Sequence, residues 1–161
     1  VKENNMPFKL SHRSIAKLEK VHPDMIRVVH RAIELTKVDF GVIYGPRTLT
    51  EQKELYAAGR SQTMKSKHLI QDSTGFSHAV DLMAYVGGQG VWELNVYDDL
   101  ADAMKKAAID EGVKIRWGAA WHIPDIREWS DTMEEAMNAY IDLRRSQGKR
   151  PFIDGPHFEM N

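Results

Sequence analysis

The chain contains no cysteine among its 161 residues. This absence excludes a disulfide scaffold, a cysteine-ligated zinc or iron–sulfur site, and catalysis by a thiol. A surplus of charge is missing too, because 22 Lys and Arg residues face 23 Asp and Glu residues. A net charge of −1 gives no broad electrostatic attraction to nucleic acid or to an anionic membrane, and we expect neither as a partner.

Long apolar runs are also lacking. No stretch approaches the roughly 18 apolar residues that a transmembrane helix needs, and residues 1–7 lack the apolar core of a signal peptide. We therefore expect synthesis in a cytoplasm and no stable insertion into a membrane. A length of 161 residues corresponds to one domain, which we expect to be a monomer with a frayed end at residues 1–6.

The hydrophobic pattern mixes helices and strands without strict alternation. Helical spacing of apolar residues, together with capping-box patterns at 48–51 and 131–134, predicts helices over residues 23–35, 48–58, 96–109 and 131–145. Short apolar runs predict strands over residues 40–44, 79–85, 113–117 and 156–160. Residues 60–77 are mostly polar, and residues 87–90 are typical of a hairpin turn. This pattern favours an α+β fold with a small, mainly antiparallel sheet and flanking helices.

A metal site in this chain must use histidine and carboxylate ligands. Three segments stand out, namely Ser66-Lys67-His68, His78-Ala79-Val80-Asp81 and Asp154-Gly155-Pro156-His157. Side chains at the mouths of adjacent strands can converge on one ion, and three ligands with an open water position are the usual hydrolytic zinc site. A lone histidine is more often a surface or hydrogen-bonded residue than a ligand. Helical zinc motifs, a GxSxG elbow, a Walker loop and GxGxxG are absent.

Taken in order, five short motifs resemble those of the VanY-type zinc peptidases. They are Arg47-Thr48, Ser66-x-His68, Ala79-Val80-Asp81, Trp117-Gly118 and Asp154-x-x-His157. This family contains D-alanyl-D-alanine carboxypeptidases and phage L-alanyl-D-glutamate endopeptidases, and the resemblance covers nearly the whole chain. Residues 8–11, 22–23 and 45–52 look like the single-domain phage endolysins in particular. The resemblance implies one catalytic domain over residues 1–161, with a zinc site at the mouth of a VanY-like or Hedgehog-like sheet.

The resemblance also implies roles for individual residues. His68, Asp81 and His157 match the positions of the zinc ligands. Asp154 matches the general base, which takes a proton from the attacking water and passes it to the leaving amine. Arg47 matches the residue that stabilises the oxyanion or holds a substrate carboxylate. Taken alone, Asp154 would be a plain turn former and Arg47 a surface arginine.

The sequence departs from the family pattern around the first ligand. Residues 69–77 lengthen the spacing between His68 and Asp81, so His78 is an alternative first ligand and otherwise a residue on the substrate side. Ser66, Gln52 and Trp117 are further candidates for binding the substrate. Ser66 and Gln52 could equally be local caps or solvated side chains, and Trp117 could equally belong to the core.

A second departure follows the Trp-Gly pair. Many phage relatives carry Gly-Asp-Trp there, whereas this chain has Ala119-Ala120-Trp121. His122 and Asp125 are candidates to replace the missing carboxylate, and Trp121 could line the cleft or join the core. Residues 122–148 look like a family-variable insertion with its own helix, which either walls the cleft or is a surface addition.

These implications give a functional hypothesis. The chain would be a phage endolysin, a zinc-dependent L-alanyl-D-glutamate endopeptidase that hydrolyses peptidoglycan stem peptides during host lysis. It would wait in the host cytoplasm until the inner membrane is breached, and then reach the cell wall from the periplasm. A D-alanyl-D-alanine carboxypeptidase with the same zinc site is one alternative. A non-catalytic, zinc-stabilised murein-binding module is another.

Overall fold

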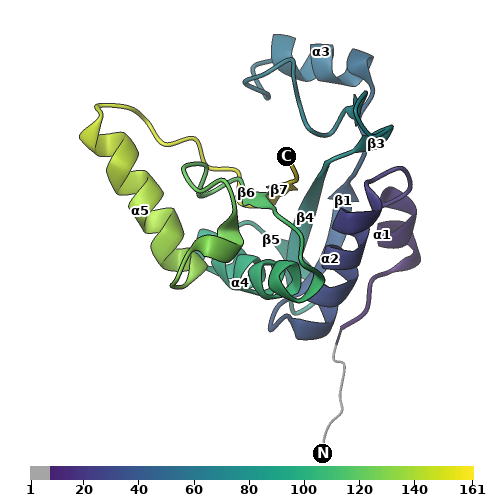
Figure 1. Cartoon of the computed structure of the whole chain (residues 1–161), viewed down its shortest axis with the longest axis horizontal. Helices are drawn as coiled ribbons and strands as arrows, with labels where there is room; N and C mark the ends of the chain where they lie inside the picture. Colours follow the sequence, from purple (N-terminus) through teal and green to yellow (C-terminus); the bar gives the residue numbers. More distant parts are fainter. Residues whose placement is uncertain (1–7) are drawn as a thin grey trace, which may run out of the picture.

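The computed structural model describes residues 8–161, so the predicted fraying of residues 1–6 lies outside the described part. Its centre is an antiparallel sheet in the order β1-β4-β7-β6, with β5 also paired to β4 (Figure 1). These strands are β1 (Asp39–Tyr44), β4 (Ala79–Val86), β5 (Gln89–Val91), β6 (Arg116–Trp117) and β7 (His157–Glu159). A separate antiparallel pair is formed by β2 (Ile70–Gln71) and β3 (Phe76–Ser77). The predicted α+β fold with a mainly antiparallel sheet is confirmed.

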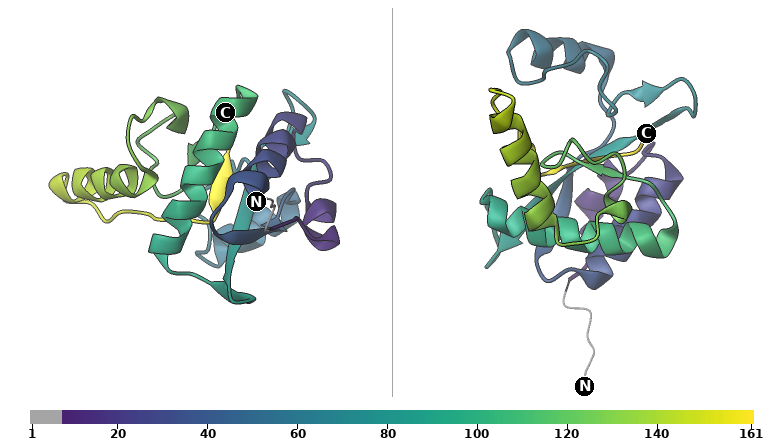
Figure 2. Two further views of the ribbon diagram at one scale, coloured as in Figure 1. Left: turned by 90° about the horizontal axis from the view of Figure 1, so that it is seen from below. Right: turned by 60° about the vertical axis from the view of Figure 1, so that its left-hand side comes forward.

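The helices surround this sheet on several sides. They are α1 (His12–Lys17), α2 (Pro23–Leu35), α3 (Leu49–Ala57), α4 (Leu94–Glu111), α5 (Met133–Ser146) and the short 3-10 helix η2 (Ile126–Glu128). Helices α2 and α4 pack against each other, whereas α3 stands at the opposite end of the molecule from α4 (Figures 1 and 2). Strand β7 lies between these two ends. None of the helices within residues 8–161 has the length and apolar character needed to cross a membrane.

Local sequence signals explain where most helices begin and end. Helix α2 covers the predicted range, with Pro23 in its first turn and a buried apolar face. Helix α3 begins with the predicted capping box, in which Thr48 and Glu51 bond each other's backbone N–H groups. The second capping box was predicted one residue too early, because the Thr132 side chain caps α5 by accepting from the Glu135 N–H. Thr132, rather than Asp131, is therefore the N-cap residue of α5.

Two other segments differ from the sequence-based expectation. The predicted strand over residues 113–117 is shorter, and only Arg116 and Trp117 pair with β7. Just before β6, the Ile115 carbonyl accepts from the Ile126 N–H at the start of η2. The polar residues 60–77 contain the β2–β3 hairpin, which Gly75 closes with a φ of +77°. A non-glycine residue would be strained at that φ.

Tyr97 joins α4 to the sheet through a buried hydroxyl group. The Tyr97 hydroxyl donates to the Val91 carbonyl at 2.8 Å and accepts from the Ala84 N–H at 3.1 Å. The ring itself is 1% exposed and belongs to the main core. Since these two backbone groups come from β5 and β4, the hydroxyl fixes the hairpin of residues 84–91 against α4.

We predict that Tyr97→Phe lowers the free energy of unfolding by about 1–2 kcal/mol. The substitution keeps the buried ring but leaves the Ala84 N–H and the Val91 carbonyl without this partner. Urea denaturation followed by circular dichroism measures the change. Tyr44→Phe is the matched control, because Tyr44 is 57% exposed, and an equal loss in both variants would contradict the role of the Tyr97 hydroxyl.

Candidate metal and catalytic site

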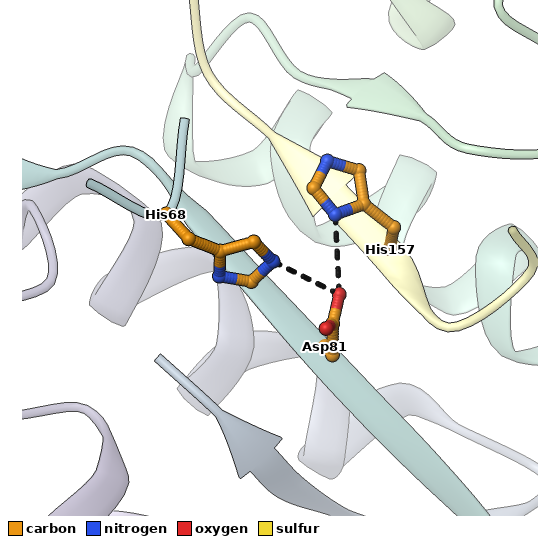
Figure 3. Close-up of side chains that lie close together, drawn as sticks. All are labelled: His68, Asp81 and His157. Carbon is orange, nitrogen blue, oxygen red and sulfur yellow. Dashed lines mark hydrogen bonds and ion pairs between the residues drawn. The ribbon is translucent and has the colours of Figure 1, made fainter. Parts of the chain in front are cut away.

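Three side chains from three different segments converge at the end of the sheet. Asp81 lies on β4, His157 lies on β7, and His68 lies in the loop before β2 (Figure 3). One Asp81 carboxylate oxygen lies 3.2 Å from His68 Nε2 and 3.1 Å from His157 Nδ1. Asp81 and His157 are direct partners in the β4–β7 register, so the strand pairing itself brings them together. This group could hold a metal ion, because its ligand atoms all lie within 4.8 Å of one another.

The outer nitrogen of each histidine is held by a hydrogen-bond acceptor. His68 Nδ1 lies 2.8 Å from the Gly45 carbonyl oxygen, and His157 Nε2 lies 2.8 Å from a Glu159 carboxylate oxygen. A carbonyl oxygen and a carboxylate can only accept, so these two nitrogens carry hydrogen. In a neutral imidazole the other nitrogen then has a lone pair, and in both rings this nitrogen faces Asp81. The arrangement orients both rings as metal ligands.

The surroundings shift the pKa values of Asp81 and His157. Burial alone would raise the pKa of Asp81, but the hydrogen bonds from His157 and His68 outweigh it and hold that pKa well below its usual range. Burial lowers the pKa of His157, but its bonds to Asp81 and Glu159 raise it to about 10. Asp81 is therefore an anion, and in the protein without metal a proton on His157 compensates its charge. A metal cation would compete with that proton.

Asp154 lies beside this group on the turn before β7. The turn is closed by the Asp154 N–H donating to the Gly118 carbonyl at 2.8 Å and by the His157 N–H donating to the Asp154 carbonyl at 3.1 Å. A side chain at Gly118 would meet the Asp154 carbonyl and the His157 side chain, so the absent Cβ allows this close approach. Burial, and next the charge of Asp81, raise the pKa of Asp154. A carboxylate with a raised pKa suits proton transfer.

A cavity of about 350 Å³ opens in front of these residues. Its lining includes all three residues of the metal-binding group and Asp154, and also Arg47 and Ser66. Arg47 donates from Nη1 to the Gln52 side-chain oxygen at 2.7 Å and lies 3.5 Å from Ser66 Oγ. Ser66 Oγ accepts from the His68 N–H at 3.1 Å. The arginine is thus held against the first segment of the metal-binding group.

Gln52 does not reach the cavity as the predicted substrate-binding role requires. It is fully buried, and its amide nitrogen donates to Ser61 Oγ and to the Thr63 carbonyl while its oxygen holds Arg47. A buried amide needs these partners. Gln52 therefore connects α3 to residues 61–63 behind the cavity wall.

Trp117 and His78 are also placed away from the cavity, against the expectation that they bind substrate. Trp117 is 0% exposed, and its indole N–H donates to the Gly155 carbonyl at 2.8 Å, so its role is packing. His78 is buried between Thr74 Oγ1 and the Asn161 carbonyl, each 2.7 Å from a ring nitrogen. It is not part of the group formed by His68, Asp81 and His157.

Glu159 and Phe152 were not found as site residues from the sequence, whereas Trp121 was a candidate for lining the cleft. Glu159 is the acceptor behind His157, and Trp121 packs its ring 5.5 Å from the His157 ring and lines the cavity with Phe152. Glu159 follows His157 by two positions, and side chains two apart on a strand share one face, so this partner was predictable. Phe152 precedes the Asp154-x-x-His157 motif by two residues but belongs to none of the motifs, and the folded chain brings it to the cavity.

Comparisons with known proteins agree over the length of the chain. The family model described as phage L-alanyl-D-glutamate peptidase matches residues 6–161. The L-alanyl-D-glutamate peptidase of Escherichia phage T5 is 32% identical over 159 residues, which cover 96% of this chain and 99% of that protein. The crystal structure of the Serratia marcescens L-Ala D-Glu endopeptidase ChiX matches with a TM-score of 0.67 at 32% identity. That match covers 98% of this chain and 94% of the other.

We predict that Gln52→Ala loosens the wall of the cavity. The variant loses the bonds to Arg47, Ser61 and Thr63 and leaves a buried void, so the free energy of unfolding falls by about 2–3 kcal/mol. Hydrogen exchange of residues 58–67 measures the local effect and should become faster. Gln62→Ala removes an exposed glutamine from the same cavity wall, and its exchange should match the wild type. Unchanged exchange in Gln52→Ala would contradict this role.

Proposed function

This chain belongs to the phage L-alanyl-D-glutamate peptidase family, and we propose that it hydrolyses the bond between L-alanine and D-glutamate in peptidoglycan stem peptides. The observation that carries the proposal is the convergence of His68, Asp81 and His157 beside Asp154 in one cavity. The relative from phage T5 and the Serratia marcescens protein are both named for this activity. Both matches extend over nearly the whole chain, so they include every segment of the cavity.

Zinc is the metal that we propose for this site. Two imidazole nitrogens and one carboxylate form a donor set of catalytic zinc sites, which leave a position open for water. Within residues 8–161 the fit is supported by the two ring orientations, since Gly45 and Glu159 turn the lone pairs of His68 and His157 toward Asp81. A zinc ion in this position supplies a Lewis acid that polarises the scissile carbonyl and lowers the pKa of a water molecule.

Asp154 acts as the general base in this proposal. Its carboxylate accepts a proton from the attacking water and then donates that proton to the nitrogen of the leaving D-glutamyl group. The raised pKa allows the carboxyl group to hold the proton between these two steps. The turn that Gly118 closes keeps Asp154 next to the residues that hold the metal.

Arg47 stabilises the negative charge that develops on the carbonyl oxygen. Its guanidinium group lines the cavity, and Gln52 holds one of its nitrogens in a fixed direction. A donor that is already oriented costs little reorganisation when the charge appears. Ser66, held between His68 and Arg47, offers a hydroxyl group to the substrate at the same wall.

We further infer the oligomeric state, the partners and the location in which the protein acts. It acts as a monomer, without nucleic acid and without stable insertion into a membrane. It stays in the host cytoplasm until the inner membrane is breached, and then reaches the cell wall from the periplasm. The support for this sequence of events is the family membership together with the peptidoglycan bond that the relatives are named for.

We predict that His68→Gln abolishes zinc binding, whereas His78→Gln retains it. His68 Nε2 faces Asp81, but both nitrogens of His78 bond to Thr74 and Asn161. Metal analysis after dialysis against zinc should give close to one ion per chain for the wild type and for His78→Gln. Circular dichroism of the three proteins controls for folding. Retention of zinc by His68→Gln together with its loss from His78→Gln would make His78 the first ligand.

We predict that purified peptidoglycan yields new N-terminal D-glutamate when digested with the protein. Chelator should abolish this release and added zinc should restore it, as measured by mass spectrometry of the products. Asp154→Asn should lower the rate by at least about 100-fold while zinc stays bound, because only the proton acceptor is lost.

Other products of this digestion would change the conclusion. Release of free D-alanine would make the protein a carboxypeptidase that uses the same residues. Binding to peptidoglycan with no new ends would leave a murein-binding module. Either result contradicts the proposed endopeptidase activity.

A further inference from the structure

The two walls of the cavity differ in their chemistry. One wall is formed by side chains from the segment 47–67, and it contains four cations, namely Arg47, Arg60, Lys65 and Lys67. Another part of the lining is formed by Trp121 and Phe152, whose rings stack at 6.2 Å, together with Asp154. The three residues of the metal-binding group line the same cavity. The lining is therefore cationic in one part and aromatic in another.

No carboxylate from the segment 47–67 lines the cavity. Residues 55–68 contain no Asp or Glu, and within residues 8–161 none of the four cations forms an ion pair at 4.0 Å or less. By contrast, Arg27, Arg31 and Arg127 elsewhere on the surface are each paired with a carboxylate. Four like charges around one cavity repel one another. An anionic ligand would relieve that repulsion.

The two residues joined by the proposed scissile bond also differ in chemistry, since one is apolar and the other is acidic. On the acyl side of an L-alanyl–D-glutamate bond stands a methyl side chain. On the amine side stands glutamate, which has two carboxyl groups and keeps one free when the peptide continues through the other. The acidic half and the apolar half of the substrate thus match the two unlike walls.

We propose that Arg60, Lys65 and Lys67 form a subsite for the free carboxylate of the D-glutamyl residue. This inference rests on the proposed function, and it fixes the direction in which the stem peptide lies in the cavity. The glutamyl carboxylate lies along the cationic wall, and the alanyl side faces Trp121 and Phe152. Three carboxylates also line the cavity, from Asp81, Asp154 and Glu159, and they disfavour the opposite direction by repelling the acidic half.

The subsite is a source of specificity as well as affinity. Ser66, which stands between Lys65 and Lys67 in the sequence, lines the same cavity and offers a hydroxyl group that can donate to the same carboxylate. Lys65 and Arg60 are exposed, and Lys67 is half-buried. Contacts from exposed cations are weak one at a time and are screened by salt, so we expect the three to act together.

The test compares two synthetic stem peptides that differ in one group. One carries the free carboxylate on D-glutamate, and the other carries a carboxamide at that position. The variant Arg60→Gln/Lys65→Gln/Lys67→Gln removes the subsite and leaves Arg47 in place. The control Arg13→Gln/Lys53→Gln/Lys149→Gln removes the same charge from exposed residues that do not line the cavity.

We expect the zinc-loaded wild type and the control to cleave the carboxylate peptide with a kcat/KM about 10-fold or more above that of the amide. The subsite variant should lose about 10-fold on the carboxylate peptide, mainly through KM, and keep its value on the amide. Raising the salt concentration should reduce the preference of the wild type for the carboxylate peptide over the amide peptide, because salt screens the exposed cations.

Equal losses on both peptides, or a wild type that does not distinguish them, would overturn the subsite while leaving the peptidase activity established. A wild type that cleaves neither peptide in the presence of zinc would instead overturn the proposed function, and the subsite with it. The three results are distinguishable in one set of rate measurements.

Discussion

The structure of this site depends on one buried carboxylate, that of Asp81. Its side chain is only 14% exposed, and an isolated carboxylate at such a position would be costly without partners. The partners are the two imidazoles of His68 and His157, which bond to a single oxygen of that carboxylate. Because β4 pairs with β7 at this residue, the same hydrogen bonds that form the sheet also complete the site.

The two imidazole rings beside Asp81 are held in place by neighbouring groups. The Gly45 carbonyl and Glu159 accept from the outer nitrogens, and the aromatic ring of Trp121 covers His157. A glycine is needed at position 45 since a side chain there would collide with the backbone carbonyl of Lys17. Close packing of backbone segments thus fixes the ring orientations.

Much of this architecture could be predicted from local patterns. Helix α2 starts and ends where its proline and apolar spacing indicate, and β4 has nearly the predicted bounds. Local patterns failed where segments distant in the sequence bond to one another. The shortened β6 is such a case, because η2 bonds to Ile115. The role of Gln52 was missed for a similar reason, since its partners at residues 61–63 become visible only once the loop folds back.

The sequence by itself determined which chemistry is available to this protein. Without cysteine, only histidine and carboxylate can form a metal site, and the order of the motifs pointed to His68, Asp81, His157 and Asp154. Only the tertiary structure decided which of these side chains meet. His68 and His78 have the same chemistry and lie ten positions apart, yet one faces Asp81 and the other bonds to Thr74 and Asn161. The physical reason is that side-chain direction follows from how β2, β3 and β4 pack together, and motif spacing does not encode that packing.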